Sequence, residues 1–166
     1  MFIVQLIRKV FHTFTKTYKT LSLKQPRTCA IAKSISVLGD KWSLLILRDI
    51  ILHKKTRFKE FRSSKEKIAT NILSNRLKSL MEERLIEKLN PSGTKKSTRY
   101  IATDKGISSL SIIIELYLFS IDSIDESMLD ESQINTKSQI SQNRSLFEEK
   151  KKLEYFAFLK ELSELK

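Results

Sequence analysis

The segment from residue 68 to residue 103 constrains the fold of this chain more than any other part. Its first portion, IATNILSNRLKSLMEERLI, carries apolar residues at intervals of three and four, which predicts a helix with one apolar face. Two short alternating segments follow at 85–89 and 98–103, and NPSGTKKS between them is typical of a hairpin turn. We therefore expect a helix, a stop and a two-stranded β-hairpin.

Apolar patterns on both sides of this segment predict the remaining helices. Positions 31, 35 and 38 predict a helix that Gly39 ends, and SLLILRDIIL at 43–52 is apolar nearly all round, as in a buried central helix. Phe58 and Phe61 anchor a short helix, and a long apolar helix begins at residues 104–106. Three helices, a hairpin and a helix are the order of a winged helix-turn-helix. The expected fold is mainly α with a small β-hairpin wing (α+β), with N- and C-terminal helical extensions.

Charge divides the chain into three segments. Residues 1–27 carry a net charge of +6, residues 28–119 carry +9, and residues 120–166 carry −3. We expect a basic amphipathic N-terminal extension, a winged helix-turn-helix DNA-binding domain at 28–119, and a polar linker followed by a C-terminal amphipathic helix. The total of +12 favours a polyanionic partner, either a nucleic acid or an anionic membrane surface.

The expected recognition helix has a polar face of unusual composition. Asn71, Ser74, Asn75 and Lys78 lie opposite the apolar stripe, whereas an ordinary solvated face, which is the alternative reading, mixes Glu with Lys. Asparagine pairs bidentately with adenine, serine bonds to base edges, and lysine neutralises phosphate, so the face predicts insertion into a DNA major groove. Thr70 suits either a DNA contact or a role near the helix start.

Basic residues around this helix extend the candidate DNA surface. Arg76 suits either a phosphate contact or an ion pair with Glu83. Lys95, Lys96 and Arg99 surround the expected wing tip, where cations meet the DNA backbone, although exposed basic turns are also common.

Other classes of protein receive little support from the sequence. One cysteine excludes an internal disulfide, and no apolar run approaches the ~18 residues of a membrane-spanning helix, so we expect a cytoplasmic protein. His12 and His53 are isolated, and Glu82-Glu83 has no associated base. We therefore expect no metal, no cofactor and no enzyme activity.

Several motifs together resemble one family. They are Cys29 before the first helix, LGDKWSLLILRD (38–49), RFKEF (57–61), IATNILSNRLKSLMEERLI (68–86) and TDKG (103–106), and they resemble the HxlR-type transcriptional regulators, relatives of the MarR group. The resemblance covers residues 27–119 and implies a homodimeric winged helix-turn-helix regulator without catalytic activity. We expect a repressor that binds double-stranded DNA at an inverted-repeat operator. Long terminal extensions are not typical of the family.

Several alternatives stay open. Cys29 has Arg27 and Lys33 nearby, which favours a reactive thiolate, and some regulators of this kind sense oxidants or electrophiles at this place; the other reading is a small apolar residue packed under the first helix. Residues 2–21 form a basic amphipathic stripe suited to dimer packing, to a DNA-facing arm or to a membrane surface. The alternative function is a basic architectural or membrane-surface protein that reads no sequence.

Trp42 begins an apolar helix, so we expect it in the core rather than in a ligand site.

Overall fold

The computed structural model of this chain describes residues 29–91 and 97–164. The chain divides into two units, residues 1–34 and 35–166, and the second unit holds the expected winged helix-turn-helix. The basic stripe expected at 2–21 lies outside the described residues.

The central helix of the second unit is α3 (Lys41–Ile51), preceded by α2 (Ala30–Leu38). The Asp40 carboxylate caps α3 by accepting hydrogen bonds from the backbone N–H groups of Trp42 at 3.0 Å and Ser43 at 3.2 Å. Gly39 lies between the two helices. The position requires glycine because a Cβ there would collide with the carbonyl oxygen of Ile35. Its backbone angle φ is not positive, so close packing rather than a left-handed conformation requires the glycine.

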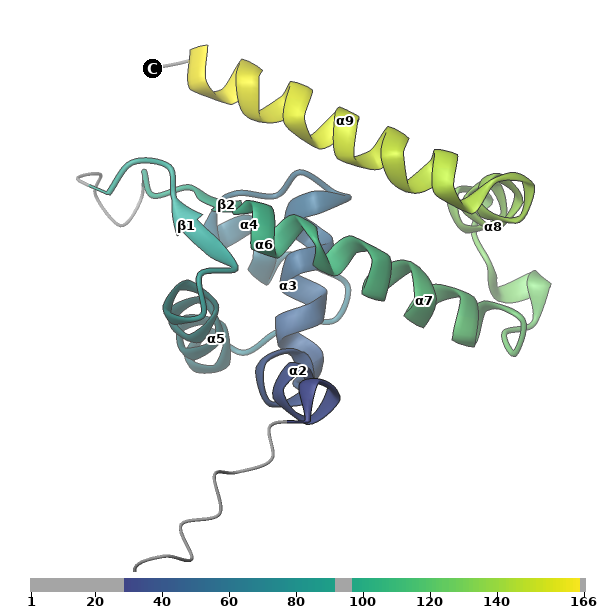
Figure 1. Cartoon of the computed structure of the whole chain (residues 1–166), viewed down its shortest axis with the longest axis horizontal. Helices are drawn as coiled ribbons and strands as arrows, with labels where there is room; N and C mark the ends of the chain where they lie inside the picture. The colour runs from purple at the N-terminus through teal and green to yellow at the C-terminus, as the bar shows by residue number, and fades with distance from the viewer. Residues whose placement is uncertain (1–28, 92–96, 165–166) are drawn as a thin grey trace, which may run out of the picture. The chain divides into compact units, whose positions relative to one another are not determined.

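Helix α3 is buried because other elements cover it on several sides. It packs against α5, α7, β2 and α9, and Figure 1 shows it in the middle of this arrangement. Its apolar side chains Ile46, Leu47, Ile50 and Ile51 are buried. Trp42, at the start of α3, is half-buried against the same core, which confirms its expected structural position.

The recognition-helix region follows the predicted order. Helix α4 (Phe58–Arg62) is short and buries Phe61, and α5 (Thr70–Glu82) buries Leu73, Leu77 and Leu80. The chain leaves α5 through Arg84, which has a φ of 56°, and the N–H of Leu85 donates to the carbonyl of Leu80 at 2.9 Å. This is a left-handed helix end of the kind that glycine usually occupies.

The wing consists of the antiparallel strands β1 (Ile86–Lys88) and β2 (Tyr100–Ala102), with Ile86 opposite Ala102 and Lys88 opposite Tyr100. On the edge of β2 that faces away from β1, the N–H of Tyr100 donates to the carbonyl of Thr56 at 2.7 Å.

The helix expected after the wing is divided at Ser108 into α6 (Asp104–Ile107) and α7 (Ser109–Ile121). The result is mainly helical with one hairpin, which confirms the predicted winged-helix fold.

The C-terminal segment is more helical than expected. After a 3-10 turn, η1 (Glu126–Met128), come α8 (Glu131–Gln142) and α9 (Arg144–Glu164). Residues 131–142 therefore form a helix and not a linker. Asp130 and Gln133 explain its start, because each side chain accepts a hydrogen bond from the other residue's backbone N–H.

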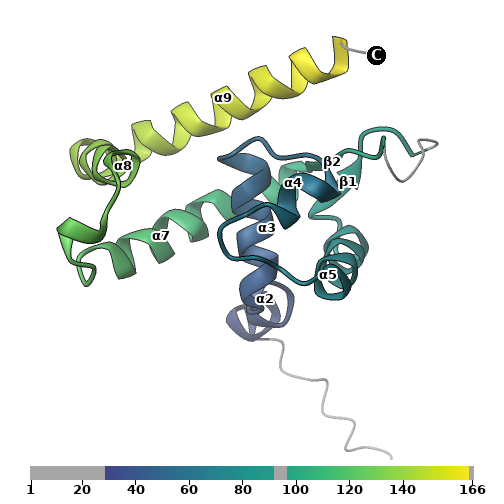
Figure 2. The same cartoon turned by 180° about the vertical axis from the view of Figure 1, so that it is seen from behind.

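Helix α9 returns along the core towards the wing (Figure 2). Its residue Tyr155 is fully buried, and the Tyr155 hydroxyl accepts a hydrogen bond of 2.8 Å from the backbone N–H of Ala102 in β2. The C-terminal helix is thus part of the same core as the wing.

Candidate nucleic-acid interface

Helix α5 separates its apolar and polar residues as the sequence predicts. Leu73, Leu77 and Leu80 are at most 2% exposed and fix the helix on the core. The opposite face consists of residues at the spacing i, i+3, i+4 and i+7, all of them exposed: Asn71, Ser74, Asn75 and Lys78. The structure therefore brings these four predicted DNA-reading residues together on one exposed surface.

The hydrogen-bonding capacity of this face differs between its residues. The Ser74 hydroxyl donates to the carbonyl of Thr70 at 3.0 Å, so its oxygen keeps lone pairs that can accept from a base or a water molecule. Asn71 and Asn75 are exposed amides, each with two donor hydrogens and an acceptor oxygen. An amide of this kind matches the donor–acceptor edge of adenine.

Lys78 and Arg76 differ in their surroundings. The Lys78 ammonium lies 3.7 Å from the Glu82 carboxylate, and its side chain is 75% exposed. Ion pairs this exposed contribute only about 0.2–1 kcal/mol, so a phosphate can replace the carboxylate at little cost. Arg76 is half-buried, and its expected partner Glu83 instead lies 3.7 Å from the ammonium of Lys105. The ion-pair alternative for Arg76 is therefore not formed among the described residues.

The start of α5 lies at the exposed end of the same face. Thr70 is the first residue of α5 and is exposed, while Ala69 holds the cap position and provides no side-chain hydrogen bond. Thr70 is therefore not the capping residue. The N–H groups of the first turn remain available to a negatively charged group, as helix N-termini commonly are.

The wing residues are only partly described. Lys95 and Lys96 lie outside the described residues. Arg99 is half-buried, and its guanidinium donates to the Thr56 hydroxyl at 3.1 Å. Arg99 thus joins the base of the hairpin to the segment before α4, rather than extending from the tip.

A hollow lies between α5 and the hairpin. Its volume is about 420 Å³, and it is lined by Phe58, Ser74, Leu77, Lys78, Met81, Lys88, Thr98 and Tyr100. Burial raises the pKa of Tyr100. Lys88 adds a second cation beside Lys78 that the sequence analysis did not single out.

A charged cluster on α3 is the main feature that the sequence analysis missed. The Asp49 side chain is only 4% exposed, and its carboxylate accepts hydrogen bonds from Arg48 at 2.7 and 3.1 Å and from Lys55 at 2.8 Å. Its third donor is the hydroxyl of Ser64, in the turn before α5. Burial alone would raise the pKa of Asp49, but the hydrogen bonds from Lys55, Ser64 and Arg48 outweigh it and lower the pKa below its usual value.

Cys29 immediately precedes α2, and its thiol is free and exposed. Of the two readings that the sequence left open, the exposed thiol does not match a small apolar residue packed under the first helix. Among residues 29–91 and 97–164, no three His, Cys, Asp or Glu side chains are grouped so that they could hold a metal ion. In the same ranges no helix has the length and apolar character needed to cross a membrane.

Comparison with known proteins shows that this chain is similar to one family. A family model described as HxlR-like helix-turn-helix matches residues 37–128. Two relatives are uncharacterised HTH-type transcriptional regulators of Bacillus subtilis (strain 168). YdzF is 28% identical over 95 residues, which are 57% of this chain and 87% of YdzF. YvaP is 30% identical over 98 residues, which are 59% of this chain and 90% of YvaP.

A solved structure supports the same fold. PA1607, described as a candidate transcription factor, superposes with a TM-score of 0.55 at 29% sequence identity. The superposition covers 64% of this chain and 73% of PA1607. The helices, the hairpin and the exposed polar face of α5 therefore occur in a chain whose relatives are transcriptional regulators.

Proposed function

This chain belongs to the HxlR-like helix-turn-helix family, and we propose that within this family of DNA-binding regulators it acts as a dimeric, sequence-specific repressor. The family membership confirms the resemblance carried by the sequence motifs. The observation that supports sequence-specific binding best is α5, which buries its leucines and exposes two amides, a hydroxyl and an ammonium on one face.

Residues on and around α5 divide into two proposed roles. Asn71, Ser74 and Asn75 read base edges, because amide and hydroxyl groups distinguish one base pair from another. The others contact the DNA backbone, because cations and helix N-termini bind phosphate without regard to sequence: Thr70, Arg76, Lys78, Lys95, Lys96 and Arg99.

A dimer on an inverted repeat is the second part of the proposal. One recognition helix contacts too few base pairs to select a single site in a genome, and two-fold pairing doubles the site. Helix α7 offers a surface for a second copy of this chain. Ile112, Leu116 and Phe119 follow one another at intervals of four and three residues and are 40%, 46% and 87% exposed.

We propose that the bound dimer represses transcription by excluding polymerase from overlapping DNA, and that it works in the cytoplasm by binding rather than catalysis, without a cofactor. A response to oxidants through Cys29 is a further proposal. It is supported by the exposed thiol and by the basic neighbours Arg27 and Lys33 in the sequence.

Selection from a library of random-sequence DNA duplexes tests the proposal. The wild-type protein should enrich an inverted repeat. Asn71→Ala or Asn75→Ala should weaken binding to the enriched duplex by about 1–3 kcal/mol and leave binding to a scrambled duplex nearly unchanged. Lys78→Ala should weaken both duplexes and reduce the salt dependence of binding by about one phosphate contact.

The competing function is a basic protein that binds nucleic acid or membranes without reading sequence. In that case the selection would enrich no sequence, and Asn71→Ala would affect both duplexes alike. Either result would contradict direct readout by α5.

A further inference from the structure

The turn between α4 and α5 is attached to α3 by a buried carboxylate. Ser64 lies in this turn, is 9% exposed, and donates its hydroxyl hydrogen to Asp49 of α3. The Lys55 ammonium bridges the same two residues, at 2.6 Å from the Ser64 oxygen and 2.8 Å from the Asp49 carboxylate. Residues from α3, from the loop after it and from the turn therefore meet at one carboxylate.

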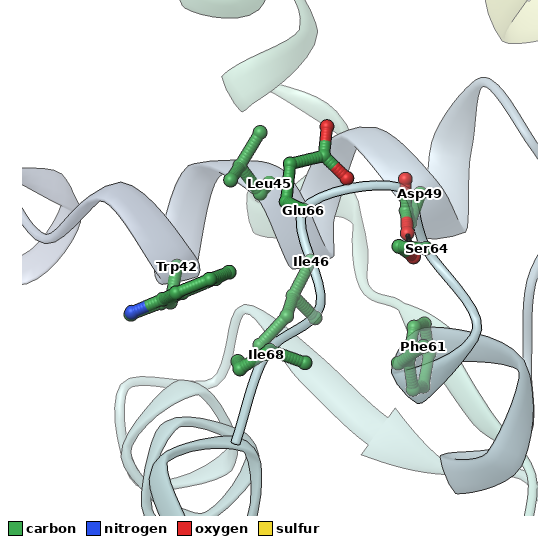
Figure 3. Close-up of a pocket in the computed structure, with 8 residues that line it drawn as sticks. All are labelled: Trp42, Leu45, Ile46, Asp49, Phe61, Ser64, Glu66 and Ile68. Carbon is green, nitrogen blue, oxygen red and sulfur yellow. Dashed lines mark hydrogen bonds between the residues drawn. The ribbon is translucent and has the colours of Figure 1, made fainter.

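Alternate residues of the turn face α3. After Ser64, Glu66 accepts a hydrogen bond of 2.7 Å from the guanidinium of Arg48, and Ile68 is 7% exposed in the core. The intervening Lys65 and Lys67 are exposed, and so is Glu66 itself. Figure 3 shows the turn crossing α3, with Ser64 beside Asp49 and Ile68 beside Ile46. The turn is thus fixed at three successive points, of which two are polar.

From this arrangement we infer that Asp49 is a positioning residue for DNA readout: it holds the turn against α3 and so sets the direction of α5. The inference rests on the proposed function of α5. Ile68 is followed by Ala69 and then by the first residue of the helix, so the attachment lies directly before the DNA-reading face. A tilt of about 10° at this end would displace the base-reading residue Asn75, about 7.5 Å along the helix, by about 1.3 Å. A bidentate base contact does not tolerate a shift of that size.

The chemistry of the cluster suits positioning better than stabilisation. In a buried ion pair the favourable Coulomb attraction is largely offset by the free-energy cost of desolvating the two charges. The pair therefore contributes little net stability. Its hydrogen bonds nevertheless have narrow ranges of distance and angle. Arg48 extends the cluster, because one side of its guanidinium binds Asp49 and the other side binds Glu66 of the turn.

Two adjacent serines provide a matched test. Ser64→Ala removes the hydroxyl that donates to Asp49. Ser63→Ala removes a hydroxyl that donates to the carbonyl of Glu60 at 2.8 Å, within the end of α4. Each variant is compared with the wild type on the duplex that the wild type selects and on a scrambled duplex of equal length.

Ser64→Ala should weaken binding to the selected duplex about tenfold and binding to the scrambled duplex less than twofold. The slope of log affinity against log salt should stay the same, because no phosphate contact is lost. Ser63→Ala should change none of these quantities, and Ser64→Thr, which keeps a hydroxyl, should restore most of the affinity. In an Asp49→Asn background, Ser64→Ala should have a smaller effect than in the wild type, because the hydrogen bond between these two residues is already altered and only the bond from Lys55 to the Ser64 oxygen is still to be lost.

The binding measurements are made well below the thermal midpoint of each variant, so that every protein compared is folded. If Ser64→Ala does not fold, Glu66→Gln replaces it, because this change alters the contact between the turn and Arg48 of α3. If Ser64→Ala weakens binding to both duplexes equally, the cluster contributes to stability alone and the inference is overturned. A variant that weakens binding to neither duplex would overturn it as well. A wild-type protein that selects no sequence would overturn the proposed function itself, before any variant is compared.

Discussion

Asp49 combines burial with three kinds of hydrogen-bond donor, and this combination determines how its charge contributes to stability. Its pKa in the folded protein is lowered, although burial alone would raise it, because Lys55, Ser64 and Arg48 donate to the carboxylate. In the unfolded chain the pKa returns to about 3.9. The carboxylate therefore stabilises the fold above this unfolded-state pKa, and the contribution is lost as the pH falls through the lower folded-state pKa.

The first prediction is that Asp49→Asn reduces the free energy of unfolding at pH 7 by about 3 kcal/mol, because Arg48 and Lys55 lose their buried counter-charge. Below pH 4 the difference between wild type and variant should shrink. Urea unfolding between pH 2 and pH 7 measures both quantities. A constant difference across this range would contradict the assignment of the lowered pKa to Asp49.

A second prediction concerns Cys29, whose thiol is exposed. Diamide should oxidise two of these thiols to a Cys29–Cys29′ disulfide between subunits, itself being reduced to the hydrazine, or should give a mixed disulfide when a small thiol is present. DNA affinity should change on oxidation and recover with reductant, while Cys29→Ser should bind DNA and ignore diamide. A non-reducing gel and a DNA-binding titration check these outcomes. DNA binding that diamide leaves unchanged would assign the signal to another residue.

Single residues also show where sequence patterns stop being informative. The polar face of α5 could be predicted because the helix period alone places Asn71, Ser74 and Lys78 together. The partners of Asp49 could not, because Ser64 is fifteen residues away and only the folded turn brings it to α3. In the same way Glu83 pairs with Lys105, twenty-two residues away, rather than with Arg76 nearby.

At the scale of elements, the sequence predicted the helices of the winged domain but missed α8, the helix before α9. Mostly apolar sequences mark α3 and α7 and an apolar period marks α5, whereas α8 has one buried residue, Ile140, in an otherwise polar sequence. Its capping box at Asp130 and Gln133 was the available signal. The apolar stripe expected in α9 was only partly correct: Leu162 is buried, but Leu153 and Phe156 are exposed, and the buried face carries Phe147 and Tyr155 instead.

The third prediction concerns the contact between α9 and the wing. Tyr155→Phe keeps the ring in the core but leaves the buried N–H of Ala102 without its acceptor, which should cost about 1–3 kcal/mol of unfolding free energy. Amide hydrogen exchange at Ala102 should become faster in the variant. Urea unfolding and exchange measured by NMR check the two effects.

Tyr117→Phe is the matched control for this experiment. The Tyr117 hydroxyl donates to the carbonyl of Gln133 at 2.8 Å, a contact between α7 and α8 that does not involve the wing. Exchange at Ala102 should therefore match the wild type in this variant. An Ala102 amide that exchanges equally fast in all three proteins would show that Tyr155 does not protect β2.

At the scale of the whole molecule, the C-terminal helices belong to the DNA-binding domain rather than following it. The family match ends at residue 128, yet one compact unit extends from residue 35 to residue 166. Buried side chains from beyond the matched region join the same core: Ile140, Phe147 and Tyr155. A truncation after residue 128 would expose their partners, so we expect it to destabilise this unit.

The exposed stripe on α7 leads to the last prediction, which concerns assembly. Phe119 is 87% exposed, more than a large aromatic side chain on a monomer usually is, and Ile112 and Leu116 continue the stripe. If a second copy covers this surface, Phe119→Glu should shift the protein from dimer to monomer in sedimentation experiments while leaving the fold intact. Binding to the selected inverted repeat should weaken strongly, because its two half-sites, about 10–10.5 base pairs apart or a multiple of this, need two connected recognition helices.

Met128→Glu is the matched control, because it places the same charge at a residue 78% exposed in η1. It should change neither the oligomeric state nor binding to the inverted repeat. A wild-type protein that sediments as a monomer at all concentrations and still protects both half-sites would contradict the dimer and assign the exposed stripe to another partner.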